Sequence, residues 1–296
     1  MIHLDRLRVT YGGIAAVDDL SFTARPGEIF GLLGPNGAGK TTTISCISGL
    51  LRPSAGRVSV SGALGVVPQE IALYDDLSAA ENIAYWGGAN RLRGRELHDR
   101  VHEVLEQTGL ADRATEPVAR FSGGMKRRLN FACGIVHQPK VLLLDEPTVG
   151  VDPQSRVRLL ELTRNLARAG ATVLYTTHYM EEAEALCDRV LIVDHGHALA
   201  EGTLAELRSL HGDRDMVRFA GAFQPEAVRR AFAGAGIDVV QAEENVVTLA
   251  VADGSRRLPA VIAELSSAGG EIRSTTLSQP SLESLFIKLT GKELRE

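Results

Sequence analysis

The segment 34–41 combines residue types that can hold a polyphosphate without a covalent bond. Its sequence, GPNGAGKT, fits the pattern G-x-x-x-x-G-K-[ST] and lies between an apolar run, 29–33, and a segment expected to be helical, 42–50. Glycines let the backbone curl and direct N–H groups at phosphates, and a helix beginning near Gly39 adds the positive end of its dipole. Lys40 can place its charge on the β- and γ-phosphates, and the Thr41 hydroxyl can ligate Mg²⁺. We therefore predict nucleotide contacts from the following residues: Gly34, Pro35, Asn36, Gly37, Ala38, Gly39, Lys40, Thr41 and Thr42.

Two adjacent carboxylates, Asp145 and Glu146, follow the clearest buried strand of the sequence, the apolar run 141–144. Two charges at the end of a buried strand are costly unless a cation or water lies beside them. With a phosphate loop upstream, Asp145 is interpreted as a Mg²⁺-side carboxylate. Glu146 is then the candidate that polarises the attacking water.

Three further positions could contribute to a site. A predicted strand, 171–176, ends at Thr177-His178. Ligands bind at the carboxyl ends of strands in nucleotide-binding folds, so a functional role is favoured for His178. The Ser-Gly-Gly turn 122–124 precedes a predicted helix, which makes it a candidate anion site. Tyr11 precedes a Gly-Gly turn and could stack on a base, although the residues alone favour packing against its neighbours.

Composition limits the class of protein. The chain has 296 residues, of which 44% are hydrophobic and 23% charged, as in ordinary soluble proteins. Its net charge of −5 argues against a nucleic-acid partner. The sequence has no run of 18 apolar residues, and residues 1–10 lack the apolar core of a signal peptide. The three cysteines are far apart and are expected to be buried, reduced thiols in a cytosolic protein: Cys46, Cys133 and Cys187.

The periodicity predicts an α/β nucleotide-binding domain, 1–211, followed by a smaller α+β accessory domain, 213–296. Segment 75–110 is predicted to be a helical insertion, and with the helix that ends near 136 it forms a helical subdomain of about 75–135. In the second domain the order β-α-β-β-α-β suggests a ferredoxin-like unit. Other expected strands are 2–10, 17–24, 57–60, 64–67, 190–194, 216–219, 237–241, 246–251 and 271–277, and other expected helices are 153–168, 225–232, 258–266 and 281–289.

Residues 1–211 resemble the nucleotide-binding subunit of an ABC transporter, with six motifs in the family's order. Segment 34–41 corresponds to the Walker A loop, Gln69 to the Q-loop, and Asp145-Glu146 to the end of the Walker B strand. The other three motifs are the signature Ser122-Gly123-Gly124-Met125, the D-loop Gly150-Val151-Asp152 and the switch histidine His178. In addition, Tyr11 falls at the position of an adenine-stacking aromatic. The region from 280 to 291 resembles the tail of ABC-2-type export ATPases of the daunorubicin-resistance kind.

The resemblance implies a P-loop ATPase that uses ATP and Mg²⁺. Two copies would enclose two ATP molecules head to tail. Each site would combine one chain's Lys40, Thr41, Gln69, Asp145, Glu146 and His178 with the partner's signature residues Ser122, Gly123 and Gly124. Gln69 would assist both catalysis and Mg²⁺ binding, beside Thr41 and Asp145. The chain would lie on the cytoplasmic face of the cell membrane and energise a separate membrane permease that exports drug, antibiotic or lipid-like molecules.

The sequence departs from the family pattern in two places, and other readings stay open. Met125 stands where the signature more often has glutamine, and the segment between Gly62 and Gln69 is short. The alternative function is a soluble ABC ATPase that is not coupled to transport. A repair ATPase would need a long coiled coil, which is absent here, and ribosome-acting members usually carry two cassettes. A cluster-assembly ATPase remains possible, whereas the presence of Glu146 and His178 argues against a non-hydrolytic regulator.

Overall fold

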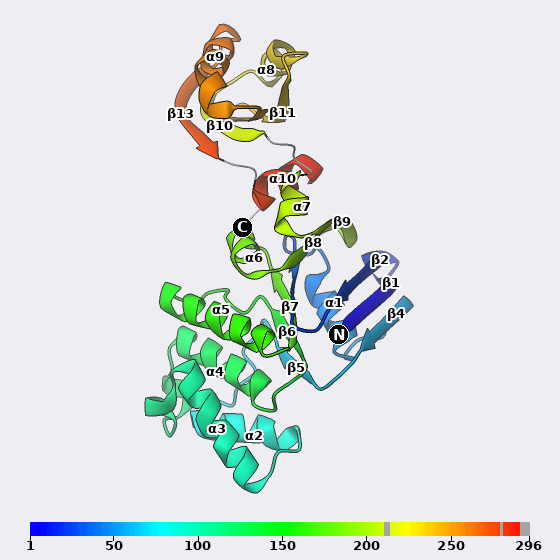
Figure 1. Cartoon of the computed structure of the whole chain (residues 1–296), viewed down its shortest axis with the longest axis vertical. Coiled ribbons are helices and arrows are strands. Elements are labelled where there is room, and N and C mark those ends of the chain that lie inside the picture. Colours follow the sequence, from blue (N-terminus) through cyan, green and yellow to red (C-terminus); the bar gives the residue numbers. More distant parts are fainter. Residues whose placement is uncertain (210–213, 279–280, 291–296) are drawn as a thin grey trace. The chain divides into compact units, whose positions relative to one another are not determined.

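A computed structural model describes residues 1–209, 214–278 and 281–290. The chain divides into two compact units, Met1–Leu199 and Ala200–Glu296 (Figure 1). The boundary predicted at 211–213 falls outside the described residues. Within the described part of the chain, no helix is both long enough and apolar enough to cross a membrane.

The first unit is built on a six-stranded sheet whose order is β5-β6-β7-β3-β8-β9. The neighbouring pairs from β5 to β8 are parallel. Every residue of β3, β6 and β7 is buried, because other elements cover both faces of the sheet; this explains the continuous apolar runs in the sequence. The six strands are β3 (Ile29–Leu33), β5 (Leu64–Val67), β6 (Val141–Asp145), β7 (Thr172–Thr177), β8 (Arg189–Asp194) and β9 (His197–Gly202).

The register brings the predicted site residues to one edge of this sheet. Leu33 pairs with Thr177, and Asp145 pairs with Thr176. The phosphate loop, the Asp145-Glu146 pair and His178 therefore all follow the carboxyl ends of neighbouring strands.

A second, antiparallel sheet packs on the first through helix α1 (Lys40–Ile47), which lies between them (Figure 1). Its order is β2 (Ile14–Ala24), β1 (Ile2–Tyr11) and β4 (Ala55–Val60). Residues in β1 alternate between buried and exposed, as expected for a sheet with one face against the core. Phe22 of β2 stacks on Phe30 of β3, with ring centroids 4.8 Å apart, and joins the two sheets in one core.

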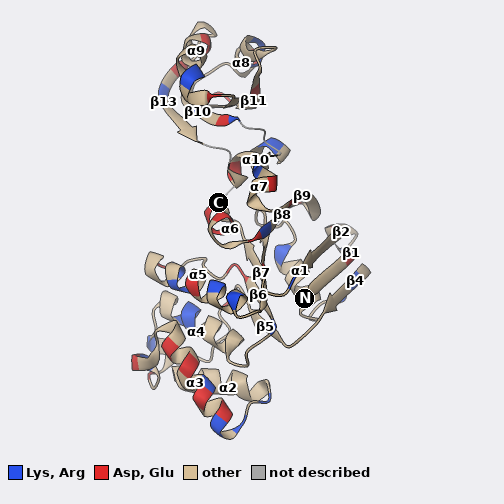
Figure 2. Ribbon diagram, viewed as in Figure 1, with Lys and Arg blue, Asp and Glu red and all other residues tan. Residues whose placement is uncertain are grey.

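The helices of the first unit begin where the sequence supplies caps. Within the predicted helical insertion, helix α2 begins at Ala79, because Ser78 and Glu81 form a capping box. Helix α3 carries charged residues of both signs along its exposed face (Figure 2), while Val101, Val104 and Leu105 face inward. The helices of this part are α2 (Ala79–Ala89), α3 (Gly94–Thr108), α4 (Gly123–Ile135), α5 (Pro153–Arg168) and α6 (Met180–Leu186), with 3₁₀ turns at Ala111–Arg113 and Val118–Arg120.

The second unit contains a four-stranded antiparallel sheet in the order β11-β12-β10-β13. This order and the alternation of strands and helices match the predicted ferredoxin-like unit. Helices α8 and α9 cover the apolar core that Val217, Phe219 and Leu249 form. The elements are α7 (Leu204–Ser209), β10 (Asp215–Ala222), α8 (Pro225–Phe232), β11 (Ile237–Ala242), β12 (Val246–Val251), α9 (Gly254–Ser267), β13 (Glu271–Ser278) and α10 (Leu282–Thr290).

Several predicted boundaries were wrong. The helix after the phosphate loop begins at Lys40, not 42, because Gly39 is its N-cap, and it ends at Ile47. Strand β2 begins at Ile14, since only Gly12 and Gly13 are needed for the turn. The short helices α6 and α7 were not predicted. Cys46, Cys133 and Cys187 are buried and free, as predicted.

Candidate active site

The phosphate loop needs glycine for both conformation and space. Gly37 and Gly39 have φ angles of 82° and 98°, in the region that side chains rarely adopt. A Cβ on Gly34 would lie 2.3 Å from the carbonyl oxygen of Val193, and one on Gly39 would lie 2.5 Å from that of Ala16. The loop therefore has the curled backbone predicted from the sequence, and the neighbouring backbone leaves no room for side chains at Gly34 and Gly39.

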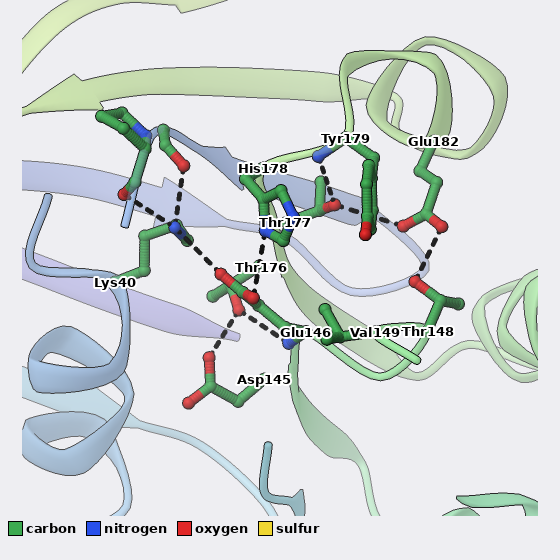
Figure 3. Close-up of polar contacts among 12 residues, drawn as sticks. Lys40, Asp145, Glu146, Thr148, Val149, Thr176, Thr177, His178, Tyr179 and Glu182 are labelled. Atoms are coloured by element: carbon green, nitrogen blue, oxygen red, sulfur yellow. Dashed lines mark hydrogen bonds and ion pairs between the residues drawn. The ribbon is translucent and has the colours of Figure 1, made fainter. Parts of the chain in front are cut away.

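Lys40, Glu146 and His178 form a continuous chain of polar contacts (Figure 3). Lys40 Nζ lies 3.0 Å from Glu146 Oε1, and both side chains are only 4% exposed. The other carboxylate oxygen, Oε2, lies 3.1 Å from His178 Nδ1. Lys40 also donates to the carbonyl oxygens of Gly34 and Pro35, at 2.8 and 3.0 Å. All three N–H groups of the ammonium thus have partners, and a phosphate at this position would compete with Glu146 for one of them.

The backbone at Glu146 is strained. Its φ of 45° is unusual for a residue with a side chain. Two acceptors hold this conformation, because the Glu146 N–H faces both the hydroxyl and the carbonyl oxygen of Thr176, at 3.0 and 3.2 Å. Strain of this kind persists only where the surroundings fix it, and it is common in active sites.

Asp145 and Thr41 form an oxygen-rich pair that suits Mg²⁺. Burial raises the pKa of Asp145, while hydrogen bonds from Thr176 and Thr41 act in the opposite direction. The Thr176 hydroxyl donates to Asp145 Oδ1 at 2.7 Å, which leaves the second carboxylate oxygen for another partner. Carboxylate and hydroxyl oxygens beside a phosphate loop are suitable Mg²⁺ ligands. These residues therefore fit the predicted cation.

The position of Gln69 is fixed by a hydrogen bond to its backbone carbonyl oxygen, not by its side chain. Its side chain is exposed, and its carbonyl oxygen accepts a short hydrogen bond from the Arg127 guanidinium. Arg127 is buried on α4, where burial lowers its pKa, and it also donates to the carbonyl oxygen of Val149 at 3.1 Å. It thereby joins the signature helix to two loops of the candidate site. Sequence reasoning missed Arg127, because only the fold brings these three segments together.

The signature residues begin helix α4. Ser122 is the N-cap, and its hydroxyl accepts from the Met125 N–H at 3.3 Å. A Cβ on Gly124 would lie 2.3 Å from Asp152 Oδ2, so glycine permits α4 to pack closely against the start of α5. Among the described residues, no hydrogen bond or ion pair links Ser122, Gly123 or Gly124 to the phosphate loop of the same chain. Tyr11 is 53% exposed at the end of β1, so its ring is open to an outside contact.

Sequence reasoning also missed Glu182, a buried carboxylate on α6 that hydrogen-bonds to Thr148 and Thr177. The signal for Glu182 becomes visible only when helix α6 is known, because this helix is too short to be predicted from its period. Glu182 then lies four residues before Leu186 on the apolar face, where an acid without a structural role is not expected.

Comparisons with known proteins agree with this geometry. Residues 17–149 match the ABC transporter family, and residues 202–290 match the C-terminal domain of DrrA1-3-like ATP-binding proteins. The linearmycin resistance ATP-binding protein LnrL of Bacillus subtilis is 40% identical, with 100% of both chains covered. The daunorubicin resistance ATP-binding protein DrrA3 of Streptomyces coeruleorubidus is 38% identical, with 99% of this chain and 97% of that protein covered.

The fold agrees as well. A solved ATP-binding subunit of an ABC transporter aligns with a TM-score of 0.67 at 31% identity, over 72% of this chain and 93% of that one. The predicted family, fold class and ATPase activity are therefore confirmed: the chain belongs to the ABC transporter family, as an ATP-hydrolysing subunit with a DrrA-like C-terminal domain.

Proposed function

We propose that this ATPase energises a separate membrane permease of the ABC-2 export type, located at the cytoplasmic face of the cell membrane. The observation that carries the proposal is the Lys40–Glu146–His178 chain beside Asp145 and Thr41, which combines phosphate, cation and water-activating groups at one sheet edge. Relatives named for resistance to linearmycin and daunorubicin support export of a drug, antibiotic or lipid-like compound. A soluble ABC ATPase without a transport role receives no support from these relatives.

Each residue of the site has a proposed role in ATP hydrolysis. Lys40 and the backbone N–H groups of segment 34–42 hold the phosphates, and Tyr11 stacks on the adenine. Thr41, Gln69 and Asp145 hold Mg²⁺, which when bound neutralises charge on the β- and γ-phosphate oxygens. Glu146 orients the attacking water or accepts its proton, and His178 Nδ1 fixes the Glu146 carboxylate. Catalysis then consists of positioning and charge stabilisation.

The complete site is proposed to form between two copies of the chain, arranged head to tail. Ser122 and Gly123 are exposed at the start of α4, where unpaired backbone N–H groups can bind an anion. Because no hydrogen bond or ion pair in the described part of the chain links these residues to their own phosphate loop, we propose that they bind the γ-phosphate held by the other copy. Closure and reopening of this dimer would move the permease.

The surface after Gln69 supports contact with a protein partner. Ile71, Tyr74 and Tyr85 are 40%, 45% and 50% exposed, and the two tyrosine rings contact each other edge to face. Ala72 and Trp86, their sequence neighbours, line a largely apolar cavity of about 380 Å³. Apolar groups gathered in this way often mark an interaction surface. We propose that an apolar segment of the permease binds there, close enough to Gln69 for a movement of Gln69 to be transmitted to the permease.

Transport in inside-out membrane vesicles tests the proposal. Vesicles from cells that express the chain together with a candidate ABC-2-type permease should accumulate doxorubicin when ATP is added. Glu146→Gln, the matched control, should abolish the uptake. Tyr85→Glu should lower the uptake while ATP binding by the purified chain stays normal. Equal uptake by wild type and Glu146→Gln with every exporter-type compound tried would refute a coupled export function.

A further inference from the structure

Glu182 is the most completely satisfied carboxylate near the candidate site. Its side chain is 0% exposed, and it accepts from four different side chains. Thr148 Oγ1 lies 2.7 Å from Oε1, and Thr177 Oγ1 lies 3.2 Å from Oε2 (Figure 3). Arg156 Nε also lies 2.7 Å from Oε1, and Tyr175 Oη lies 2.7 Å from Oε2. A buried charge is tolerated only where such partners replace water. Glu182 therefore holds four groups in fixed positions.

Those partners belong to the segments that carry the candidate catalytic groups. Thr148 is two residues after Glu146, and Thr177 directly precedes His178. The Thr177 hydroxyl also accepts the N–H of Tyr179 at 2.9 Å, so the backbone is fixed on both sides of His178.

A second route leads from Glu182 to the imidazole ring. The Arg156 guanidinium, which Glu182 holds, lies over the Tyr179 ring at 5.4 Å. The Tyr179 ring in turn packs on the His178 ring, with centroids 4.1 Å apart. Both the backbone and the ring of His178 thus depend on the position of one carboxylate that does not touch either of them.

We propose that Glu182 is a positioning residue that sets His178 Nδ1 against the carboxylate of Glu146. The inference rests on the proposed roles of these two residues in hydrolysis. Without the Glu182 charge, the loop after Glu146 and the turn around His178 would no longer share a common anchor. The 3.1 Å contact between His178 and Glu146 would then loosen. A displacement of about 1 Å at a reacting group can cost about 100-fold in rate.

The first test is Glu182→Gln in the full-length chain, with Glu181→Gln as the matched control. Both changes replace an acid by its isostere on helix α6, but Glu181 is exposed. Glu182→Gln should lower kcat by about 10- to 100-fold while the affinity for ADP stays within about twofold, because the phosphate loop is not part of the network. Glu181→Gln should leave both quantities unchanged. Unchanged kcat in Glu182→Gln would overturn the proposal, as would a parallel loss of kcat and ADP affinity.

A double-variant cycle with His178→Ala separates positioning from general stabilisation. If Glu182 acts through His178, Glu182→Gln should cause no further loss of kcat in the His178→Ala background. An equal loss in both backgrounds would overturn the proposal. If His178→Ala alone leaves kcat unchanged, the proposed role of His178 fails, which is a distinguishable result.

A milder variant covers the case in which Glu182→Gln does not fold. Tyr175→Phe removes one donor to Glu182 and keeps the buried charge. It should lower kcat less than Glu182→Gln, again only when His178 is present. A loss of kcat that is equal with and without His178 would count against the positioning role.

Discussion

The contact between Lys40 and Glu146 predicts an unusual effect of Glu146→Gln on nucleotide affinity. The ammonium is 4% exposed and donates to Gly34, Pro35 and Glu146, so a phosphate can bind it only by displacing one of these acceptors. Glu146 is the acceptor that a phosphate would displace, since it is a side chain and the other two acceptors are backbone carbonyls of the loop itself. Nucleotide binding by the wild type therefore includes the cost of breaking a buried ion pair.

The magnitude follows from the geometry of this pair. Removing one partner of a buried ion pair costs about 3–5 kcal/mol. Glutamine keeps one oxygen acceptor for Lys40, so the loss should approach that of a weakened buried hydrogen bond, about 1–3 kcal/mol. The free energy of unfolding without nucleotide should fall by that amount. ADP should bind about 5- to 140-fold more tightly, because each 1.4 kcal/mol is a tenfold change in affinity.

Calorimetric titration with ADP avoids turnover and measures this effect directly, with Glu181→Gln as control. The same variant should hydrolyse MgATP at least ~10²-fold more slowly, since it loses a general base. Size-exclusion chromatography should show a dimer with ATP that ADP does not support. Equal or weaker ADP binding by Glu146→Gln would show that the ion pair does not compete with phosphate. Normal turnover would move the catalytic role elsewhere, with His178 the next candidate.

Four further predictions concern other parts of the chain. Lys40→Ala should weaken ATP binding and abolish turnover; unchanged affinity and hydrolysis would contradict the proposed site. Ser122→Arg should spare ATP binding to the monomer but block hydrolysis, and full activity at high dilution of wild type would exclude a shared site. Burial raises the pKa of Asp145 in the folded state. Above that folded-state pKa the ionised carboxylate lowers the free energy of unfolding, and below the pKa of the unfolded state this destabilisation is absent. Asp145→Asn should therefore raise Tm at pH 7 without nucleotide and reduce the Tm increase caused by Mg²⁺ with ATP; a lower Tm would refute the burial argument. Removing 213–296 should leave an ATP-binding core, and loss of cooperative unfolding in that core would contradict it.

The site could be predicted from the sequence wherever its residues follow buried strands. Continuous apolar runs at 29–33 and 141–144 identify strands covered on both faces, and parallel strands end at one sheet edge. The location of the phosphate loop, Asp145 and Glu146 follows from that rule alone. Short elements escaped the same reasoning. Helix α6 has seven residues and α7 has six, fewer than two helical turns each, so neither shows a reliable period.

The contacts within the site could not be predicted, because they depend on the distance between chain segments rather than on spacing along the sequence. Arg127 joins Gln69 to Val149, which lie 80 residues apart in the numbering. The ion pair between Lys40 and Glu146 likewise joins the start of helix α1 to the residue after strand β6. From the sequence, a lysine in a phosphate loop predicts phosphate binding and a glutamate after a buried strand predicts a role toward water. The sequence does not predict that these two side chains contact each other.

The three buried carboxylates of this region differ in how many hydrogen-bond partners they have. This difference separates a carboxylate that supports the site from carboxylates that could bind a ligand or react. Glu182 accepts from four side chains of its own unit and has no capacity left for a ligand. Glu146 has two partners: Lys40, which is proposed to bind phosphate, and His178, which is proposed to hold the carboxylate in place. Asp145 is held mainly by two threonine hydroxyls, while burial still raises its pKa. A carboxylate with exchangeable or insufficient partners gains most when a cation or a nucleotide arrives. We therefore expect Asp145 and Glu146 to change partners during the ATPase cycle, while Glu182 keeps the same four partners throughout.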